Sequence, residues 1–313
     1  MLTQAQFAPQ VGFEGSTAIH KNDISFVDWA NDAEIIRGYK NSAIPVNGFV
    51  DFGIVENALQ IADGNPNIIS LGDGGEVVLT FNHPIVNGIG TDFAVFENGF
   101  LKEENSDLAF LELGFVEVST DGEQYVRFPA VSNLPSDTQI NSFGFIDARY
   151  IHNFAGKYIN LYGTPFDLSE LIPLVHNTTV NLNNINYIKI IDVVGTVNTE
   201  FATFDSLNHI VNDPYPTEFS SGGFDLDAVG IINNVTNSLN EITIFPNPVA
   251  EILQISVNGL DVKNIQIYTM DGKLVFKSNT IMPEINVSQL TSGLYLFFLE
   301  TNNSALKKVF IKK

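Results

Sequence analysis

The sequence contains no cysteine, so disulfide bonds, thiolate metal sites and cysteine nucleophiles are all excluded. Basic residues are scarce: 15 lysines and arginines stand against 36 aspartates and glutamates, giving a net charge of −21. This charge repels phosphates, which argues against binding to nucleic acid or to an anionic membrane surface. No apolar run approaches the roughly 20 residues of a membrane-spanning helix, so we expect no transmembrane segment.

The residues that are abundant favour β-structure. Hydrophobic residues make up 44% of the 313 residues and charged residues only 16%, a balance typical of globular proteins. Phenylalanine is plentiful, with 25 residues, and helix-favouring runs are few. We predict one short helix at 27–39 and a turn or two of helix at 167–174. A chain of this length has room for two domains.

The charge changes along the chain. Residues 238–313 are almost neutral, with seven lysines against six acidic residues, so the preceding part carries nearly all of the negative charge. The polar, asparagine-rich segment 233–241 has the composition of a linker. We therefore predict domains at 6–232 and 242–313. Residues 1–5 are predicted to be the remnant of a signal peptide, because small residues at positions 3 and 5 are spaced as at a cleavage site, a spacing that also arises by chance.

The C-terminal part contains short alternating runs at close spacing, with a hairpin expected at Met270-Asp271-Gly272. Such runs predict a small immunoglobulin-like sandwich. The blocks FPNPV (245–249), IQIYTMDGKLV (265–275), INVSQLTSGLYLFFLET (285–301) and KKVFIKK (307–313) resemble, in this order, the C-terminal sorting domain of the type IX secretion system of Bacteroidota. The resemblance covers 238–313. It implies export by the type IX machinery to the medium or the outer cell surface, and a signal peptide before Gln6.

The long N-terminal part is also predicted to form β-strands. VEVSTDGEQYVRF (116–128) predicts a hairpin around Asp121-Gly122, with a type I′ turn and positive φ at Gly122. Over residues 70–232 the order of strands resembles a discoidin-type or carbohydrate-binding-module jelly roll. The stretches LGDGGEVVLTF, DFAVFENGF and GFDLDAVG are similar to uncharacterised secreted surface proteins of Bacteroidota, from which no activity follows. We predict an all-β protein: a jelly-roll β-sandwich followed by a small immunoglobulin-like β-sandwich.

The stretch FDLDAV (224–229) alternates apolar residues with Asp225 and Asp227 just after a double glycine. Alternation places both carboxylates on one face of a strand. Three interpretations are open: a solvated or charged sheet edge, a calcium site, or a catalytic pair. Asp92 and Glu97 are the predicted distant ligands of the calcium ion, because carboxylates and backbone carbonyls are the ligands that calcium prefers.

For ligand contacts we predict Trp29, Tyr215 and Glu218, the last two on a proline-stiffened loop at 213–223. We expect a non-catalytic secreted or cell-surface protein that binds a glycan or another sizeable nutrient ligand, such as a corrinoid. The alternative is a secreted glycoside hydrolase or polysaccharide lyase in which two of Glu97, Glu112 and Glu117 flank the scissile bond. No HExxH or GxSxG motif supports a zinc protease or a serine hydrolase.

Overall fold

The computed structural model describes residues 7–64, 67–234, 242–257, 262–280, 282–301 and 305–313. The predicted signal-peptide remnant at 1–5 and residues 235–241 of the predicted linker lie outside these ranges. The protein is all-β, as predicted, with short 3₁₀ helices as its other regular elements. Across the described ranges, no helix combines the length and apolar character needed to span a bilayer. The chain forms two compact units, Met1–Val235 and Thr236–Lys313, and the division falls within the predicted linker.

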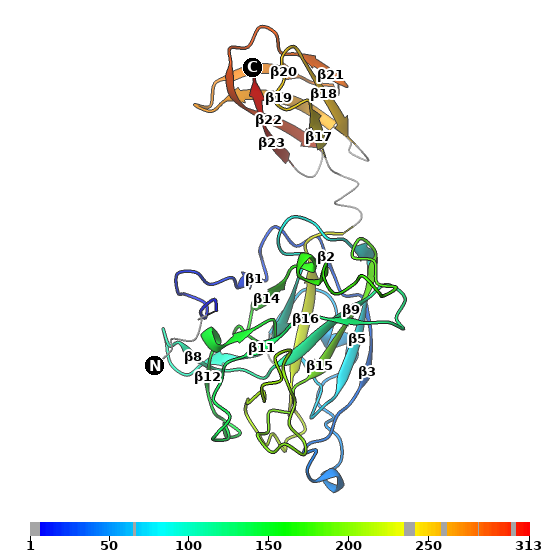
Figure 1. Cartoon of the computed structure of the whole chain (residues 1–313), viewed down its shortest axis with the longest axis vertical. Helices are drawn as coiled ribbons and strands as arrows, with labels where there is room; N and C mark the ends of the chain where they lie inside the picture. Colours follow the sequence, from blue (N-terminus) through cyan, green and yellow to red (C-terminus); the bar gives the residue numbers. More distant parts are fainter. Residues whose placement is uncertain (1–6, 65–66, 235–241, 258–261, 281, 302–304) are drawn as a thin grey trace. The chain divides into compact units, whose positions relative to one another are not determined.

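The first unit contains two main antiparallel sheets (Figure 1). The six-stranded sheet has the order β1 (Ile19–His20), β14 (Tyr162–Phe166), β6 (Phe93–Glu97), β16 (Asp225–Ile231) and β2 (Asp28–Trp29), with β4 (Ile69–Ser70) also paired to β16. The five-stranded sheet has the order β10 (Val126–Arg127), β9 (Gly114–Ser119), β15 (Ile185–Asp192), β5 (Glu76–Ile85) and β3 (Asp32–Ile36).

Shorter elements surround these sheets. A three-stranded sheet joins β12 (Ile146–Asp147), β8 (Leu108–Phe110) and β7 (Phe100–Leu101), and a two-stranded sheet joins β11 (Val131–Ser132) to β13 (Ile151–His152). The 3₁₀ helices are η1 (Pro45–Asn47), η2 (Val55–Ala58), η3 (Ala148–Tyr150) and η4 (Leu168–Leu171). The last of these confirms the helical turn predicted at 167–174, and the Asp167 carboxylate caps it by accepting the Ser169 N–H.

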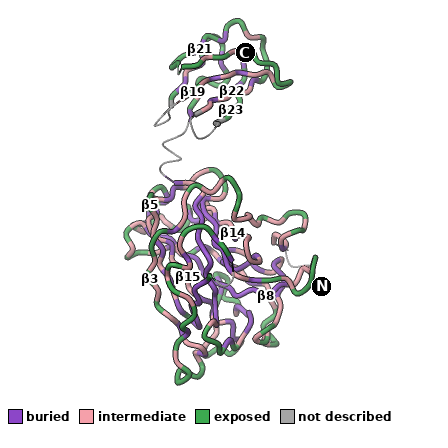
Figure 2. Tube along the Cα trace, turned by 180° about the vertical axis from the view of Figure 1, so that it is seen from behind, coloured by how far each residue is buried: buried purple, intermediate pink, exposed green. Residues whose placement is uncertain are grey.

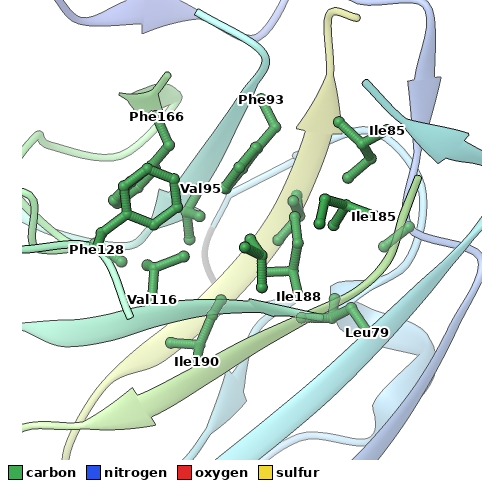
Figure 3. Packing of buried hydrophobic residues seen from close by; sticks show 14 of the residues in the cluster. Leu79, Ile85, Phe93, Val95, Val116, Phe128, Phe166, Ile185, Ile188 and Ile190 are labelled. Atoms are coloured by element: carbon green, nitrogen blue, oxygen red, sulfur yellow. The ribbon is translucent and has the colours of Figure 1, made fainter. Parts of the chain in front are cut away.

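The hydrophobic core lies between the two main sheets. Ile188 and Ile190 on β15 point into it from one side, and Phe93 and Val95 on β6 from the other (Figure 3). Phe93 stacks on Phe166 at a centroid distance of 5.3 Å. Buried residues, shown in purple, accordingly follow the strands, whereas the loops at both ends are exposed (Figure 2).

The helix predicted at 27–39 is wrong, because this segment forms β2 and β3. Along β3 the exposure alternates: Ala33 and Ile35 pack against the core, whereas Asp32, Glu34 and Ile36 are exposed. This is a period of two, as an edge strand requires, and not the period of a helix. Pairing with β5 overrides the local helical composition.

The predicted hairpin at 116–128 is confirmed in its strands, while its turn differs from the predicted type. Val126 pairs with Val118 and Arg127 with Glu117, so the connection is longer than the two residues of a type I′ turn. The Asp121 carboxylate organises it by accepting the N–H groups of residues 123 and 124, each at 2.9 Å. Gly122 has φ of +78°, as predicted.

The second unit is a sandwich of a three-stranded and a four-stranded sheet. The first sheet contains β17 (Ile242–Phe245), β18 (Ile252–Val257) and β21 (Glu284–Asn286); the second contains β20 (Leu274–Ser278), β19 (Val262–Thr269), β22 (Gly293–Thr301) and β23 (Ala305–Lys312). The hairpin predicted at 270–272 joins β19 to β20, with φ of +86° at Gly272. Its core, which includes Ile267, Phe297 and Phe310, contains residues of this unit alone.

Candidate functional site

The FDLDAV stretch forms β16 in the interior of the six-stranded sheet, between β6 on one side and β2 and β4 on the other. Asp225 is only 6% exposed and Asp227 only 1%. The predicted solvated face and charged sheet edge are therefore both wrong. The segment that leads into β4 covers this face of the strand, because Asp227 accepts the N–H groups of Asp63 (3.2 Å) and Gly64 (3.1 Å).

The double glycine is required by close packing. A Cβ on Gly222 would lie 2.0 Å from the carbonyl oxygen of Thr217, and one on Gly223 would lie 2.6 Å from a carboxylate oxygen of Asp192. Gly223 also has φ of +71°, a conformation that other residues rarely adopt. The chain can therefore turn tightly enough for the Phe224 N–H to donate to Asp192 at 2.6 Å.

Several carboxylates meet at the end of the sandwich where β16 begins. We call them the acid cluster; its members come from distant parts of the sequence and are at most 6% exposed: Glu97, Glu112, Asp192, Asp213 and Asp225. Four of the five accept hydrogen bonds that hold loops: Glu97 from the Gly99 N–H, Asp192 from Gly74 and Phe224, Asp213 from Leu113, and Asp225 from the Ser70 hydroxyl and the Asn98 amide. In the described part of the chain, the Glu112 carboxylate has no hydrogen-bond donor.

Burial and like charge both raise the pKa values in the acid cluster. Burial raises the pKa of Glu112 well above its usual value, and the neighbouring charges of Asp225 and Glu97 raise it further. Burial raises the pKa of Asp225 to about 7, although the hydrogen bonds from Ser70 and Asn98 act in the opposite direction. Beside the cluster, burial raises the pKa of Asp227 to about 6. Near neutral pH this end of the sandwich therefore holds protons that exposed carboxylates would lose.

The structure brings together three of the four predicted calcium ligands. Glu97 pairs across the sheet with Leu226, directly between Asp225 and Asp227. Asp92 lies at the opposite end of β16, where its backbone carbonyl accepts the Ile232 N–H and its carboxylate accepts the N–H groups of Gly88 and Leu168. Within the described residues, no three His, Asp or Glu side chains are placed to hold a metal ion together. The calcium site stays a prediction.

The predicted ligand contacts fall at two places. Tyr215 and Glu218 lie together beside Asn41: the Tyr215 hydroxyl donates to the Asn41 carbonyl at 2.8 Å, and the Asn41 amide donates to Glu218 at 2.5 Å. The loop 213–223 is thus tied to the loop after β3, at the end of the sandwich below β3 and β15 in Figure 1. Trp29 lies near the other end of β16, opposite Gly230, and packs against Phe96.

A groove that the sequence analysis did not predict lies on the exposed face of the five-stranded sheet. Its volume is about 320 Å³, and its lining includes Asp32, Glu34, Tyr125 and Tyr187. The ammonium group of Lys189 lies 4.0 Å from the centroid of the Tyr125 ring and so holds that ring in place. Strand alternation could have indicated this face, because Tyr187 and Lys189 alternate with the buried Ile188 and Ile190.

A second cavity, of about 540 Å³, is lined by residues 132–136, Phe204 and 208–210. At its rim the Nδ1 atom of His209 lies 3.2 Å from the carboxylate of Asp205. The same carboxylate accepts hydrogen bonds from the N–H groups of Ser132, Leu207 and His209. It therefore mainly stabilises the turn at 205–209.

Comparison with known proteins identifies the second unit. Residues 243–313 match the family of secretion system C-terminal sorting domains, as the sequence predicted. The second unit is thus a type IX sorting domain, and the protein is exported and then secreted or attached to the outer cell surface. No curated protein matches the chain.

Solved structures are only remotely similar. β-Glucuronidase 3 of Bacteroides uniformis is 13% identical, with a TM-score of 0.24; the match covers 94% of this chain and 35% of that one. PorZ, a surface component of the type IX secretion system of Porphyromonas gingivalis, is 11% identical with a TM-score of 0.22, over 85% of this chain and 50% of that one. The CBM51-2 and INT domains of Clostridium perfringens ZmpB are 9% identical with a TM-score of 0.18, over 93% and 82%. The chain thus spans half or less of the first two proteins.

Proposed function

We propose that the first unit is a non-catalytic binding domain, displayed outside the cell, that holds a glycan in the groove on the exposed face of the five-stranded sheet. The observation that carries this proposal is the lining of the groove, where the rings of Tyr125 and Tyr187 lie beside the carboxylates of Asp32 and Glu34. Aromatic rings pack against the apolar face of a sugar, and carboxylates accept hydrogen bonds from its hydroxyl groups.

The size of the groove favours a short stretch of glycan over a larger ligand. A volume of about 320 Å³ is near the lower limit for small-molecule sites, which run from about 300 to 1,000 Å³. A corrinoid needs far more enclosed space. A glycan chain needs only one or two residues in the groove, because the rest of the polymer can extend over the sheet.

The hydrolase or lyase alternative receives less support from the geometry. Glu97 and Glu112 are only 1% and 5% exposed, and a substrate cannot reach them without opening the sandwich. Glu117 lies on the exposed sheet face, but its side chain is only 13% exposed and is paired with Arg127 at 2.8 Å. A glycosidase needs two carboxyl groups on either side of one accessible bond.

The test uses the full-length protein on a glycan array, followed by calorimetric titration of any glycan that binds. Tyr187→Ala should weaken binding by about 10-fold or more, since a stacked ring contributes about 1–2 kcal/mol. Tyr187→Phe, which keeps the ring, should bind almost as the wild type does. Tyr162→Ala, on the other sheet, is the matched control and should change nothing.

Two outcomes would contradict the proposal. Binding that survives the combined Tyr125→Ala and Tyr187→Ala changes would place the glycan elsewhere. Release of shorter products from a bound glycan, detected by chromatography after long incubation, would show that the protein is an enzyme.

A further inference from the structure

A third cavity, of about 300 Å³, lies apart from the groove. Its walls come from the N-terminal segment, from residues 152–157, from β14 and from the turn before η4. The polar residues that line it include His152, Lys157, Thr164, Asp167 and Glu170. None of them was identified from the sequence, because they are spread over separate elements and form no motif.

Lys157 lines this cavity and has a hydrogen-bond donor without an acceptor. The residue is only 4% exposed, and its ammonium group donates to the carbonyl oxygens of Ala148 (2.7 Å) and Ile151 (2.6 Å). An ammonium has three N–H donors, so one has no hydrogen-bond acceptor among the described residues; the group also lies 5.9 Å from the Phe7 ring centroid and 5.7 Å from that of Tyr158. Burial lowers the pKa of Lys157 to about 7, and the charge of Asp147 only partly opposes this effect. The lysine therefore lacks a close counter-charge.

Thr164 supplies the second donor. It lies on β14 and is only 3% exposed. Its hydroxyl oxygen is buried and has no hydrogen-bond partner among the described residues. A buried hydroxyl without a partner costs about 1–3 kcal/mol, so a ligand or water in the cavity that accepts from it would be stabilised.

Acceptors are present in the same cavity. The Glu170 carboxylate accepts the Asn153 amide at 2.5 Å and lies 3.8 Å from Nε2 of His152. The His152 ring is stacked on Phe7 at a centroid distance of 4.9 Å. Asp167 also lines the cavity and uses one oxygen to cap η4. The cavity thus combines a cationic donor, a neutral donor and carboxylates held in fixed positions.

We infer that this cavity binds a small carboxylate ligand of about the size of one sugar, such as a uronic acid. The ligand carboxylate accepts hydrogen bonds from Lys157 and Thr164. The ligand hydroxyl groups donate hydrogen bonds to Glu170 and Asp167. A carboxylate supplies both the missing acceptors and the missing counter-charge. A phosphate, with its higher charge, is disfavoured by Glu170 and Asp167. This inference does not rest on the glycan groove.

The experiment is a titration of the full-length protein with D-glucuronate, followed by NMR of the ligand and by calorimetry, with D-glucose as the neutral counterpart. Glucuronate should bind and glucose should not at the same millimolar concentration. Binding at pH 8 should also take up a proton, because a carboxylate beside Lys157 raises its pKa; the heat should therefore depend on the ionisation enthalpy of the buffer. A glucuronate-terminated disaccharide distinguishes a free sugar acid from the end of an acidic glycan.

Thr164→Val is the decisive variant, since it keeps the shape of the side chain and removes a hydroxyl that has no partner to lose. It should keep or raise the wild-type melting temperature, since the unpaired hydroxyl destabilises the folded state, and it should weaken glucuronate binding by about 10-fold, the effect of one hydrogen bond to a charged group. Thr91→Val, at another position lining the cavity, is the matched control. Equal binding of glucose, unchanged affinity in Thr164→Val, or a cavity that holds water alone in the presence of glucuronate would overturn the inference.

Discussion

We predict that the burial of Asp227 stabilises the first unit in mild acid and that this contribution is lost at neutral pH. The pKa of Asp227 rises from 3.8 to about 6 on folding, chiefly because burial disfavours the charged carboxylate. The folded state therefore holds this proton more tightly than the unfolded chain does. The resulting stabilisation is complete below pH 3.8 and is lost as the pH rises through about 6.

The size of the effect follows from the shift. A change of about two pKa units corresponds to about 3 kcal/mol between pH 4 and pH 8. For a unit of about 235 residues this is about 6–12 °C in melting temperature. Asp225, whose pKa rises to about 7, changes stability in the same direction.

The perturbation is Asp227→Asn, which removes the titrating group and keeps an oxygen that accepts the N–H of Gly64 or Asp63. The difference between the melting temperatures at pH 4 and pH 8 should become smaller by about 6–12 °C than in the wild type. Trp29, the only tryptophan, lies in the first unit, so its fluorescence reports the melting of this unit alone. Comparison with the wild type cancels the contribution of groups that both proteins share, such as Lys157.

The control is Asp137→Asn, because Asp137 is exposed. It should leave the difference between pH 4 and pH 8 unchanged. The wild-type difference also contains the contribution of Lys157, whose lowered pKa acts in the opposite direction, so the comparison between variant and wild type tests the reasoning. An Asp227→Asn variant with the full wild-type difference would refute it for this residue.

Three further predictions can be tested by melting or localisation. Gly122→Val should destabilise the first unit by about 1–3 kcal/mol, because φ is +78° and a Cβ would lie 3.2 Å from the Tyr187 ring; an unchanged melting temperature contradicts this. Deleting residues 236–313 should leave a folded first unit in the periplasm, and normal surface delivery would refute the role of the sorting domain. Calcium should raise the melting temperature at pH 8, and Asp225→Ala with Asp227→Ala should remove the increase; a chelator without effect on the wild type argues against the calcium site.

Strands with regular alternation were predictable, and segments whose conformation depends on distant partners were not. The hairpin predicted at 270–272 forms between β19 and β20, and Ile265 and Ile267 on β19 face the core of the small sandwich. The helix predicted at 27–39 is wrong because the pairing of β3 with β5 outweighs the weak helical preference of these residues. In the turn after β9, the Asp-Gly pair correctly predicted positive φ, but the length of the connection is set by the Asp121 carboxylate and not by the dipeptide.

The candidate site also depends on contacts between distant segments, which a single sequence does not reveal. Alternation correctly places Asp225 and Asp227 on one face of a strand, and it cannot say what covers that face. Asp63, Gly64 and Ser70 cover it here, and they lie more than 150 residues before β16 in the sequence. Glu112 and Asp213 could not be singled out at all, since the sequence contains 36 acidic residues and only the fold shows which of them are buried together.

The stretches LGDGGEVVLTF, DFAVFENGF and GFDLDAVG come together in this arrangement. LGDGG supplies the Gly74 N–H to Asp192, ENG supplies the Asn98 amide to Asp225, and GFDLD supplies the Phe224 N–H to Asp192. All three stretches therefore meet at the acid cluster, and each hydrogen bond joins a loop to the end of a strand. Residues with this task are buried and hold the end of the sandwich together, whereas the two tyrosines that line the groove, Tyr125 and Tyr187, lie outside the three stretches. These stretches consequently belong to the scaffold of the first unit, and under the proposed function a change at Tyr187 should alter glycan binding without altering the fold.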